Sequence, residues 1–327
     1  MNHAALIMAH KNVDQVIRLI RSLSSDKIHV FVHLDKKMKI TKSEKKDMSS
    51  CADNVYIIDE RVNGMLDTWS LVEAALHLIR YAKEVGLQRG FNYSYFMLLS
   101  GQDYPIKSKK NISDYLKDSY PKPLIDCTPY DKSNWVYHKF NTFAFVKLHK
   151  FINSKTNSII LRKIIKIPSF SVMKLLSAVK KIKHKYSISY GYELYGGSAW
   201  WILPDVVIDF ILDEIKNNPK KIKKLSRTYT PEETFFQIMT MASPLSDMVD
   251  VNPIDMVAQN CMTYAYFFDD HKPFKGHPYE FTEDDFEKIM GLHQLFARKF
   301  DVTVDSKIFD MIDEKIDDSK VVFSSVK

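Results

Sequence analysis

The sequence predicts an α/β fold in which a mostly parallel central sheet is flanked by helices. In the first third of the chain, short runs of apolar residues alternate with segments of helical apolar spacing. Strands that alternate with helices pair in parallel, because each helix returns the chain to the same end of the sheet. Apolar residues make up 45% of the chain, which is ample for the core of such a sheet.

The expected elements follow one another along the chain. The pattern predicts strands at 3–10, 27–35, 54–59, 94–100 and 193–204, and helices at 13–24, 68–86, 284–290 and 295–300. Asn12 is expected to cap the first helix. Trp200 and Trp201 would point to opposite faces of their strand, so at most one of them can face a site.

Composition narrows the function classes. Glycine is scarce, at 9 residues, and neither GxGxxG nor GxxxxGK[ST] occurs. The three cysteines are far apart, which argues against a disulfide framework and favours a reducing compartment. No segment reaches the roughly 20 apolar residues of a membrane helix, so we expect a cytoplasmic protein. Net charge is +7, and residues 132–192 hold thirteen Lys and Arg without one Asp or Glu.

Three of the early strands end in polar side chains, namely His10, Asp35 and Asp103. Asp103 belongs to "FMLLSGQDYPIKS", where an apolar run stops in a turn that carries one carboxylate. Because the carboxyl ends of parallel strands share one edge, and ligands of open α/β sheets bind there, these groups could line one crevice.

Four motifs in order, "LLSGQDYPIKS", "YGGSAWWIL", "YTPEETFFQIM" and "LHQLFARKFD", resemble the core-2/I-branching β-1,6-N-acetylglucosaminyltransferases, a family that also holds the peptide O-xylosyltransferases. The likeness runs from the first strand to about Asp301. It implies a GT-A fold, which is Rossmann-like and binds a nucleotide sugar, with inversion at the anomeric carbon and no metal or other cofactor. We expect one domain over 1–327, with a nucleotide-sugar half at about 1–127, a basic insertion at about 132–192 and an acceptor and catalytic half at about 193–327.

The motif "YTPEETFFQ" holds the expected catalytic base. Inverting sugar transfer needs a carboxylate that takes the proton of the attacking hydroxyl. By resemblance the base is the second acidic residue of the motif, Glu233, with Glu232 as the alternative. The same letters also fit a helix capping box of Thr230 and Glu233, with Pro231 at the first helical position.

Fixed cations must stabilise the departing diphosphate where no metal does so. The resemblance assigns this role to Lys299 and to an arginine about twenty residues earlier, where this chain has Tyr279. A tyrosine donates a hydrogen bond but brings no charge, so Lys275, His277 or Arg298 could substitute. Lys299 as an exposed helix lysine is the structural alternative. No Asp-x-Asp pair follows a strand, and Asp269-Asp270 and Asp284-Asp285 read as solvated or capping residues.

Further donor and acceptor contacts are expected at strand ends and helix starts. Gly101 would let the sugar approach the backbone. Asp103 could bind a sugar hydroxyl or cap the following turn, where Tyr104-Pro105 redirects the chain, and Asp35 could hold the ribose or base. Trp69 could touch a substrate or belong to the core. On the acceptor side, Glu193 could bind hydroxyls and Trp200 could stack on a sugar.

The sequence therefore predicts an inverting, metal-independent glycosyltransferase that uses a UDP-sugar, and N-acetylglucosamine is the sugar expected first. The expected acceptor is a glycan or lipid-linked glycan in surface polysaccharide or glycolipid synthesis. Residues 158–186 alternate apolar and basic side chains, which suits the anionic inner face of a membrane. Two alternatives remain, a basic nucleic-acid-binding protein and a glycosyltransferase-like protein without activity. The absence of a recognition motif argues against nucleic acid as a partner.

Overall fold

The computed structural model describes residues 1–131, 133, 135–141, 190–252, 260–266 and 278–317. The basic segment 158–186, Lys275, His277 and Asp269-Asp270 lie outside the described residues. The described helices are α1 Val13–Leu23, α2 Lys42–Ser49, α3 Trp69–Gln88, α4 Lys109–Ser119, α5 Trp135–Asn141, α8 Asp205–Asn217, α9 Pro219–Leu225, α10 Phe235–Met241, α11 Phe286–Met290 and α12 Lys307–Ile316, with 3₁₀ turns η1 Pro231–Glu233, η2 Ser246–Met248 and η3 Glu283–Asp285.

The strands form one large and two small sheets. They are β1 Asn2–Ala9, β2 Ile28–Leu34, β3 Val55–Ile57, β4 Tyr93–Ser100, β5 Asp103–Pro105, β6 Leu124–Ile125, β7 Thr128–Pro129, β8 Tyr195–Gly196, β9 Trp201–Pro204, β10 Thr263–Ala265 and β11 Phe296–Arg298. The large sheet has the order β3-β2-β1-β4-β9-β6. Its first four strands are parallel, and β9 is antiparallel to both β4 and β6. The predicted mostly parallel sheet is thus confirmed.

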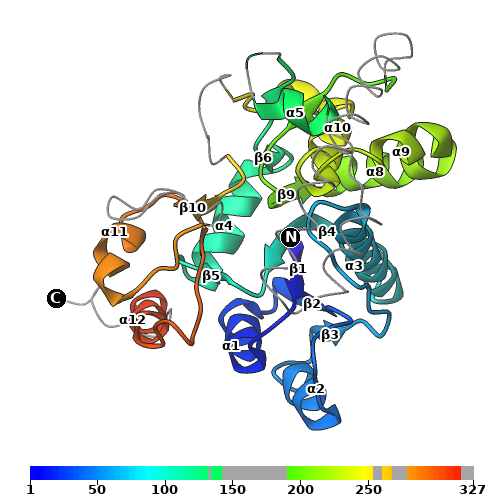
Figure 1. The fold of residues 1–327 in the computed structure, drawn as a ribbon. Helices are drawn as coiled ribbons and strands as arrows, with labels where there is room; N and C mark the ends of the chain where they lie inside the picture. The colour runs from blue at the N-terminus through cyan, green and yellow to red at the C-terminus, as the bar shows by residue number, and fades with distance from the viewer. Residues whose placement is uncertain (132, 134, 142–189, 253–259, 267–277, 318–327) are drawn as a thin grey trace, which may run out of the picture.

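Alternate side chains of β1 separate two hydrophobic cores. Ala5 and Ile7 pack on the side of α1 and α12, whereas Ala4 and Leu6 pack on the side of α3 and α8. In Figure 1, α1 and α12 lie to the left of β1, and α3 and α8 lie to the right. Both faces are therefore buried, which explains why the strand has so few polar residues.

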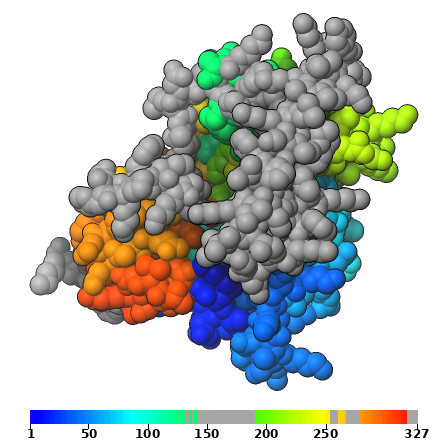
Figure 2. All heavy atoms as spheres, in the orientation of Figure 1, coloured from blue at the N-terminus to red at the C-terminus, as the bar shows by residue number. Residues whose placement is uncertain are grey.

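The N-terminal and C-terminal parts of the described chain meet on one face of the molecule. Figure 2 shows the blue N-terminal residues beside the orange and red residues of the last third. The ion pairs of Arg18 in α1 with Asp310 and Asp313 in α12 join the two parts, with N···O distances of 2.6 and 2.7 Å. Strand β11 pairs with β5, so the last third also adds to the edge where β4 ends.

Two local predictions are wrong. The segment 295–300 forms β11, because its backbone pairs with β10 on one side and β5 on the other, and this outweighs its helical apolar spacing. Asn12 does not cap α1 with its side chain. It has a left-handed φ of 54° and donates from Nδ2 to Asp301 Oδ1 at 2.8 Å instead. The predicted strand at 193–204 consists of two short strands, β8 and β9. Helix α11 lies where a short helix was expected.

Candidate active site

The carboxyl ends of β1, β2 and β4 lie side by side. The backbone of Gly101 donates to Met8 O at 2.9 Å, and that of Asp35 donates to Ala9 O at 2.8 Å. His10 follows β1 at this edge. Burial lowers the pKa of His10. The positive charges of Lys11 and Lys299 lower it further, and the charge of Asp35 acts in the opposite direction. Groups far apart in sequence thus act on one another at the end of the sheet.

Asp35 fastens the loop between β3 and α3 to the end of β2. Its Oδ1 accepts from the backbone N–H of Lys37 at 2.8 Å, and its Oδ2 accepts from that of Gly64 at 2.9 Å. A Cβ at Gly64 would lie 2.7 Å from Oδ2, so a larger residue there would displace the Asp35 carboxylate from this position. His33 Nε2 accepts from Val62 N–H at 2.8 Å and holds the same loop. A contact of Asp35 with the nucleotide stays a prediction.

Asp103 is fully buried, and its carboxylate holds the turn that precedes it, not the following turn that the sequence suggested as an alternative. Its Oδ2 accepts from Ser100 N–H at 2.8 Å, and its Oδ1 accepts from Ser100 Oγ at 3.0 Å. Burial raises the pKa of Asp103, and the guanidinium of Arg298, at 3.5 Å, opposes the shift. The same guanidinium lies 4.4 Å from the ring centre of Trp200. Arg298 therefore links the turn after β4 to the tryptophan before β9.

Gly101 and Trp69 have packing roles in the structure. A Cβ at Gly101 would meet Val16 Cγ2 at 3.2 Å and Ala9 Cβ at 3.4 Å, so its bare backbone lets α1 approach the sheet. The ring of Trp69 lies edge-on to Phe235, with ring centres 4.9 Å apart, and remains half-buried. Contacts of these two residues with a donor stay predictions.

The backbone of Tyr279 lies beside that of Lys299. The backbone N–H of Lys299 donates to Tyr279 O at 3.2 Å, and Phe281 N–H donates to Lys299 O at 2.9 Å. Lys299 is not an exposed helix lysine: it directly follows β11, and its Nζ lies 3.1 Å from Glu280 Oε1. A second positive charge close to Lys299 comes from Arg298, its neighbour in the chain, because position 279 holds a tyrosine.

Asp301 ties this segment to the loop after β1. Its carboxylate pairs with Lys11 and accepts from Asn12 Nδ2 at 2.8 Å and Thr303 Oγ1 at 2.7 Å. Burial opposes its ionisation, but the hydrogen bonds from Lys11 and Thr303 outweigh burial and hold the pKa of Asp301 well below its usual range. Lys299 is thereby kept near His10 at the end of β1.

The two acidic residues of η1 differ in their surroundings. Glu233 pairs with Lys139 of α5, and 36% of its side chain is exposed. Glu232 is 8% exposed, and its Oε1 accepts from Asp67 N–H at 2.9 Å. Burial raises the pKa of Glu232 to about 7. Backbone hydrogen bonds, including the one from Asp67, oppose the shift, and the charges of Glu233 and Asp67 add to it. Of these two carboxyl groups, that of Glu233 is the more accessible from outside the protein.

The capping-box interpretation of this turn is wrong. Thr230 has a left-handed φ of 49°, and its side chain makes no capping hydrogen bond. The α-helix begins only at Phe235, after the 3₁₀ turn. Gly197 holds the turn from the other side, because its N–H donates to Glu233 O at 2.9 Å. Thr230 and Glu233 therefore do not serve helix initiation.

On the acceptor side, Trp201 is fully buried and Trp200 is half-buried, as alternate positions of a strand require. Arg298 already covers part of Trp200, so stacking of this ring on a sugar stays a prediction. Glu193 is exposed and accepts from Tyr195 Oη at 3.1 Å. Its contact with an acceptor also stays a prediction.

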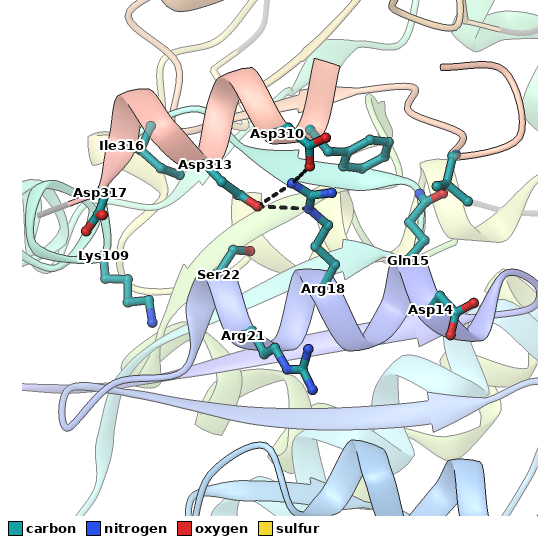
Figure 3. A pocket seen from close by; sticks show the side chains of 12 residues that line it. Asp14, Gln15, Arg18, Arg21, Ser22, Lys109, Asp310, Asp313, Ile316 and Asp317 are labelled. Atoms are coloured by element: carbon teal, nitrogen blue, oxygen red, sulfur yellow. Dashed lines mark hydrogen bonds and ion pairs between the residues drawn. The ribbon is translucent and has the colours of Figure 1, made fainter. Parts of the chain in front are cut away.

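A separate cavity of about 780 Å³ lies between α1 and α12. Figure 3 shows Arg18 reaching from α1 to Asp310 and Asp313 across it. None of the predicted site residues lines this cavity.

The described residues contain no group of three or more His, Cys, Asp and Glu side chains placed to hold a metal ion. None of the described helices has the length and apolar character needed to cross a membrane.

The model of the core-2/I-branching enzyme family matches residues 4–290. This chain belongs to the core-2/I-branching enzyme family. The human β-1,3-galactosyl-O-glycosyl-glycoprotein β-1,6-N-acetylglucosaminyltransferase is 24% identical over 340 residues, which cover 95% of this chain and 68% of that protein. Rat xylosyltransferase 2 is 20% identical, with 94% of this chain and 33% of that protein covered. The crystal structure of mouse xyloside xylosyltransferase 1 has a TM-score of 0.35 at 10% identity, with 91% and 97% of the chains covered.

Membership of the core-2/I-branching enzymes confirms the glycosyltransferase expectation at the level of the family, and the sheet order confirms the α/β fold with a mostly parallel central sheet. The nucleic-acid alternative loses its support accordingly. Sequence reasoning did not single out Lys139 or Asp67, which contact the two glutamates of η1. Lys139 is one of thirteen cations in an acid-free stretch, and no sequence signal separates it from the others.

Proposed function

We propose that this core-2/I-branching enzyme transfers a sugar from a UDP-sugar to a glycan hydroxyl with inversion, and that Glu233 is the general base. The observation that supports this most is the contrast within η1. Glu233 is accessible and paired with a cation, whereas Glu232 is buried. A base must reach the proton that it removes, so access decides between the two.

In the proposed reaction, Glu233 takes the proton as the acceptor oxygen forms a bond to the anomeric carbon. The bond from that carbon to the phosphate oxygen breaks on the opposite side, and its electron pair leaves with UDP. Lys299 supplies positive charge to the departing diphosphate. Arg298 is our candidate for the second cation, because it is adjacent in the chain and directed at Trp200 and Asp103. The proposal includes no metal.

The donor proposed first is UDP-N-acetylglucosamine, and UDP-xylose is second. The support is the named activity of the relatives, which are N-acetylglucosaminyltransferases and a xylosyltransferase. The acceptor proposed is a glycan or lipid-linked glycan of a surface polysaccharide or glycolipid. Gly101, Asp103, Asp35, Trp69 and Tyr279 remain the proposed donor-side residues, with Glu193 and Trp200 on the acceptor side.

A lipid-linked acceptor would place the reaction at an anionic membrane surface. Besides the segment 158–186, described residues support this part of the proposal. Exposed cations of α8, α9 and the following turn lie just before η1 in the chain, at Lys216, Lys220, Lys223, Lys224 and Arg227. Each cation near an anionic surface contributes about 1 kcal/mol, less at high salt. Co-sedimentation with anionic but not neutral vesicles is expected, and equal binding to both would contradict it.

The test of function begins with a thermal-shift screen of nucleotide sugars, since a ligand that binds only the folded state raises its stability. The best ligand then serves as donor for wild type and Glu233→Gln. The variant should keep donor binding and lose turnover by roughly 10²–10⁴-fold, the usual range for a general base. A Glu233→Gln enzyme with wild-type turnover would refute the assignment, and a wild type that binds donors without turnover would favour the inactive alternative.

A further inference from the structure

Three carboxyl groups meet at η1 and the loop before α3, namely those of Asp67, Glu232 and Glu233. Among the described residues, Lys139 is the one cation paired with any of them, and it pairs with Glu233. Tyr229 Oη lies 3.4 Å from Asp67 Oδ2. Helix α10, which follows η1, has the sequence FFQIMTM and brings no charge. The cluster is therefore short of positive charge, and its most buried member is Glu232.

The two oxygens of Glu232 are in unequal positions. Oε1 accepts from Asp67 N–H, whereas Oε2 is buried without a hydrogen-bond partner in the part of the chain that the structure describes. Burial of an unpaired charge costs far more than burial of an unpaired neutral hydroxyl. A protonated acid is less costly to bury at this site, with the carbonyl oxygen facing Asp67 and the hydroxyl at Oε2.

We propose that Glu232 is a positioning residue that acts as an uncharged carboxylic acid, holding the backbone of Asp67 against the turn that carries Glu233. Asp67 has a left-handed φ of 62°, which is unfavourable for a residue with a side chain. The hydrogen bond to Glu232 helps to hold this conformation at the entrance to α3.

This contact connects two parts of the site. The loop that ends at Asp67 is fastened to β2 through Asp35 and His33. Just beyond it, Trp69 packs on Phe235 behind η1. Glu232 thus joins the end of the sheet, where the donor is proposed to bind, to the turn with the proposed base. The inference rests on the proposed role of Glu233, but its protonation can be measured without turnover.

The protonation of Glu232 has a defined effect on stability. In the unfolded chain its carboxyl ionises at the ordinary pKa of 4.5, whereas in the folded protein it keeps its proton to about pH 7. The stabilising effect is complete below pH 4.5 and is lost as the pH rises through 7. Above pH 7 the ionised carboxylate is buried beside Asp67 and Glu233 with one oxygen unpartnered among the described residues, so this part of the site should lose stability and activity should fall.

The decisive experiment measures Tm between pH 4.5 and 8.5 for wild type, Glu232→Gln and Glu233→Gln. Glutamine has the shape of the protonated acid and never ionises. We expect the smallest fall in Tm for Glu232→Gln, and a fall between that of Glu232→Gln and wild type for Glu233→Gln, because the charge of Glu233 adds to the pKa shift of Glu232 without being its main cause. Parallel curves for wild type and Glu232→Gln would overturn the proposal.

Activity provides the second readout, with the best UDP-sugar as donor. Glu232→Ala, which cannot accept a hydrogen bond from Asp67, should lose more than about tenfold in kcat/KM. Glu232→Gln should have a kcat/KM close to that of wild type and keep that value at pH 8.5. A Glu232→Gln enzyme as inactive as Glu233→Gln at every pH would show that Glu232 must ionise, and would overturn the proposal. If wild type transfers no sugar, the proposed function fails, and the Tm curves alone decide on Glu232.

Discussion

Replacement of Gly197 by alanine tests whether the position of Glu233 depends on the close contact between two backbones. A Cβ at residue 197 would lie 1.8 Å from the carbonyl oxygen of Asp126 and 2.7 Å from its carbonyl carbon. No rotamer relieves this clash, because both partners are backbone atoms. One backbone must move by about 1 Å, and overpacking of this kind costs about 1–3 kcal/mol in the free energy of unfolding.

The displacement should reach the proposed base. Gly197 N–H donates to Glu233 O at 2.9 Å, and Asp126 is held by the backbone N–H of Cys261 at 3.3 Å. A misplacement of about 1 Å at a reacting group can reduce the rate about 100-fold. We expect Gly197→Ala to lose about that factor in kcat/KM while nucleotide-sugar binding, measured by thermal shift, persists.

Gly291→Ala and Gly196→Ala are the matched controls. Gly291 has a φ of −74° with its nearest contact at 3.4 Å, so alanine should fit without loss. At Gly196 the nearest atoms belong to side chains, Trp135 and Val136 at 3.2 Å, which can adjust. Gly197→Ala with the Tm and kcat/KM of Gly291→Ala would refute the reasoning. An unfolded Gly197→Ala protein would show only that the contact is essential to the fold, so kcat/KM is compared at a temperature where both variants are folded.

Three further predictions concern the charged groups of the site. Activity should survive EDTA, and loss of activity on chelation that Mn²⁺ restores would contradict the metal-free mechanism. Lys299→Ala should weaken UDP binding about 10- to 100-fold in calorimetry, since hydrogen bonds to charged groups contribute about 1.5–3 kcal/mol. Arg298→Met should lower the free energy of unfolding by about 3 kcal/mol, because it leaves the fully buried carboxylate of Asp103 without its cation, and adding Asp103→Asn should recover part of the loss. Asp301 has a pKa below its unfolded value of 3.8, so it stabilises the fold above that pH and less as the pH falls below it. Asp301→Asn should therefore flatten the acid limb of Tm against pH, and an unchanged limb would mean that its bond to Lys11 does not persist in solution.

The architecture of the first hundred residues could be predicted from the sequence because it rests on local signals. The apolar runs that end at His10, Asp35 and Ser100 are strands, and their parallel pairing follows from the alternation with helices. The segment 295–300 could not be predicted in the same way. Its apolar spacing favours a helix, but pairing with β10 and β5, which lie far away in sequence, makes it a strand.

The sequence alone determined which chemical groups are present: the two glutamates of the "TPEET" turn, the lysine of "FARKF" and the missing arginine at Tyr279. Only the tertiary structure decided how they differ. Glu232 and Glu233 are adjacent and identical in type, yet one is buried against Asp67 and the other faces Lys139. The reason is physical: burial and neighbouring charges set the state of a carboxyl group, and both come from segments more than ninety residues away in the chain.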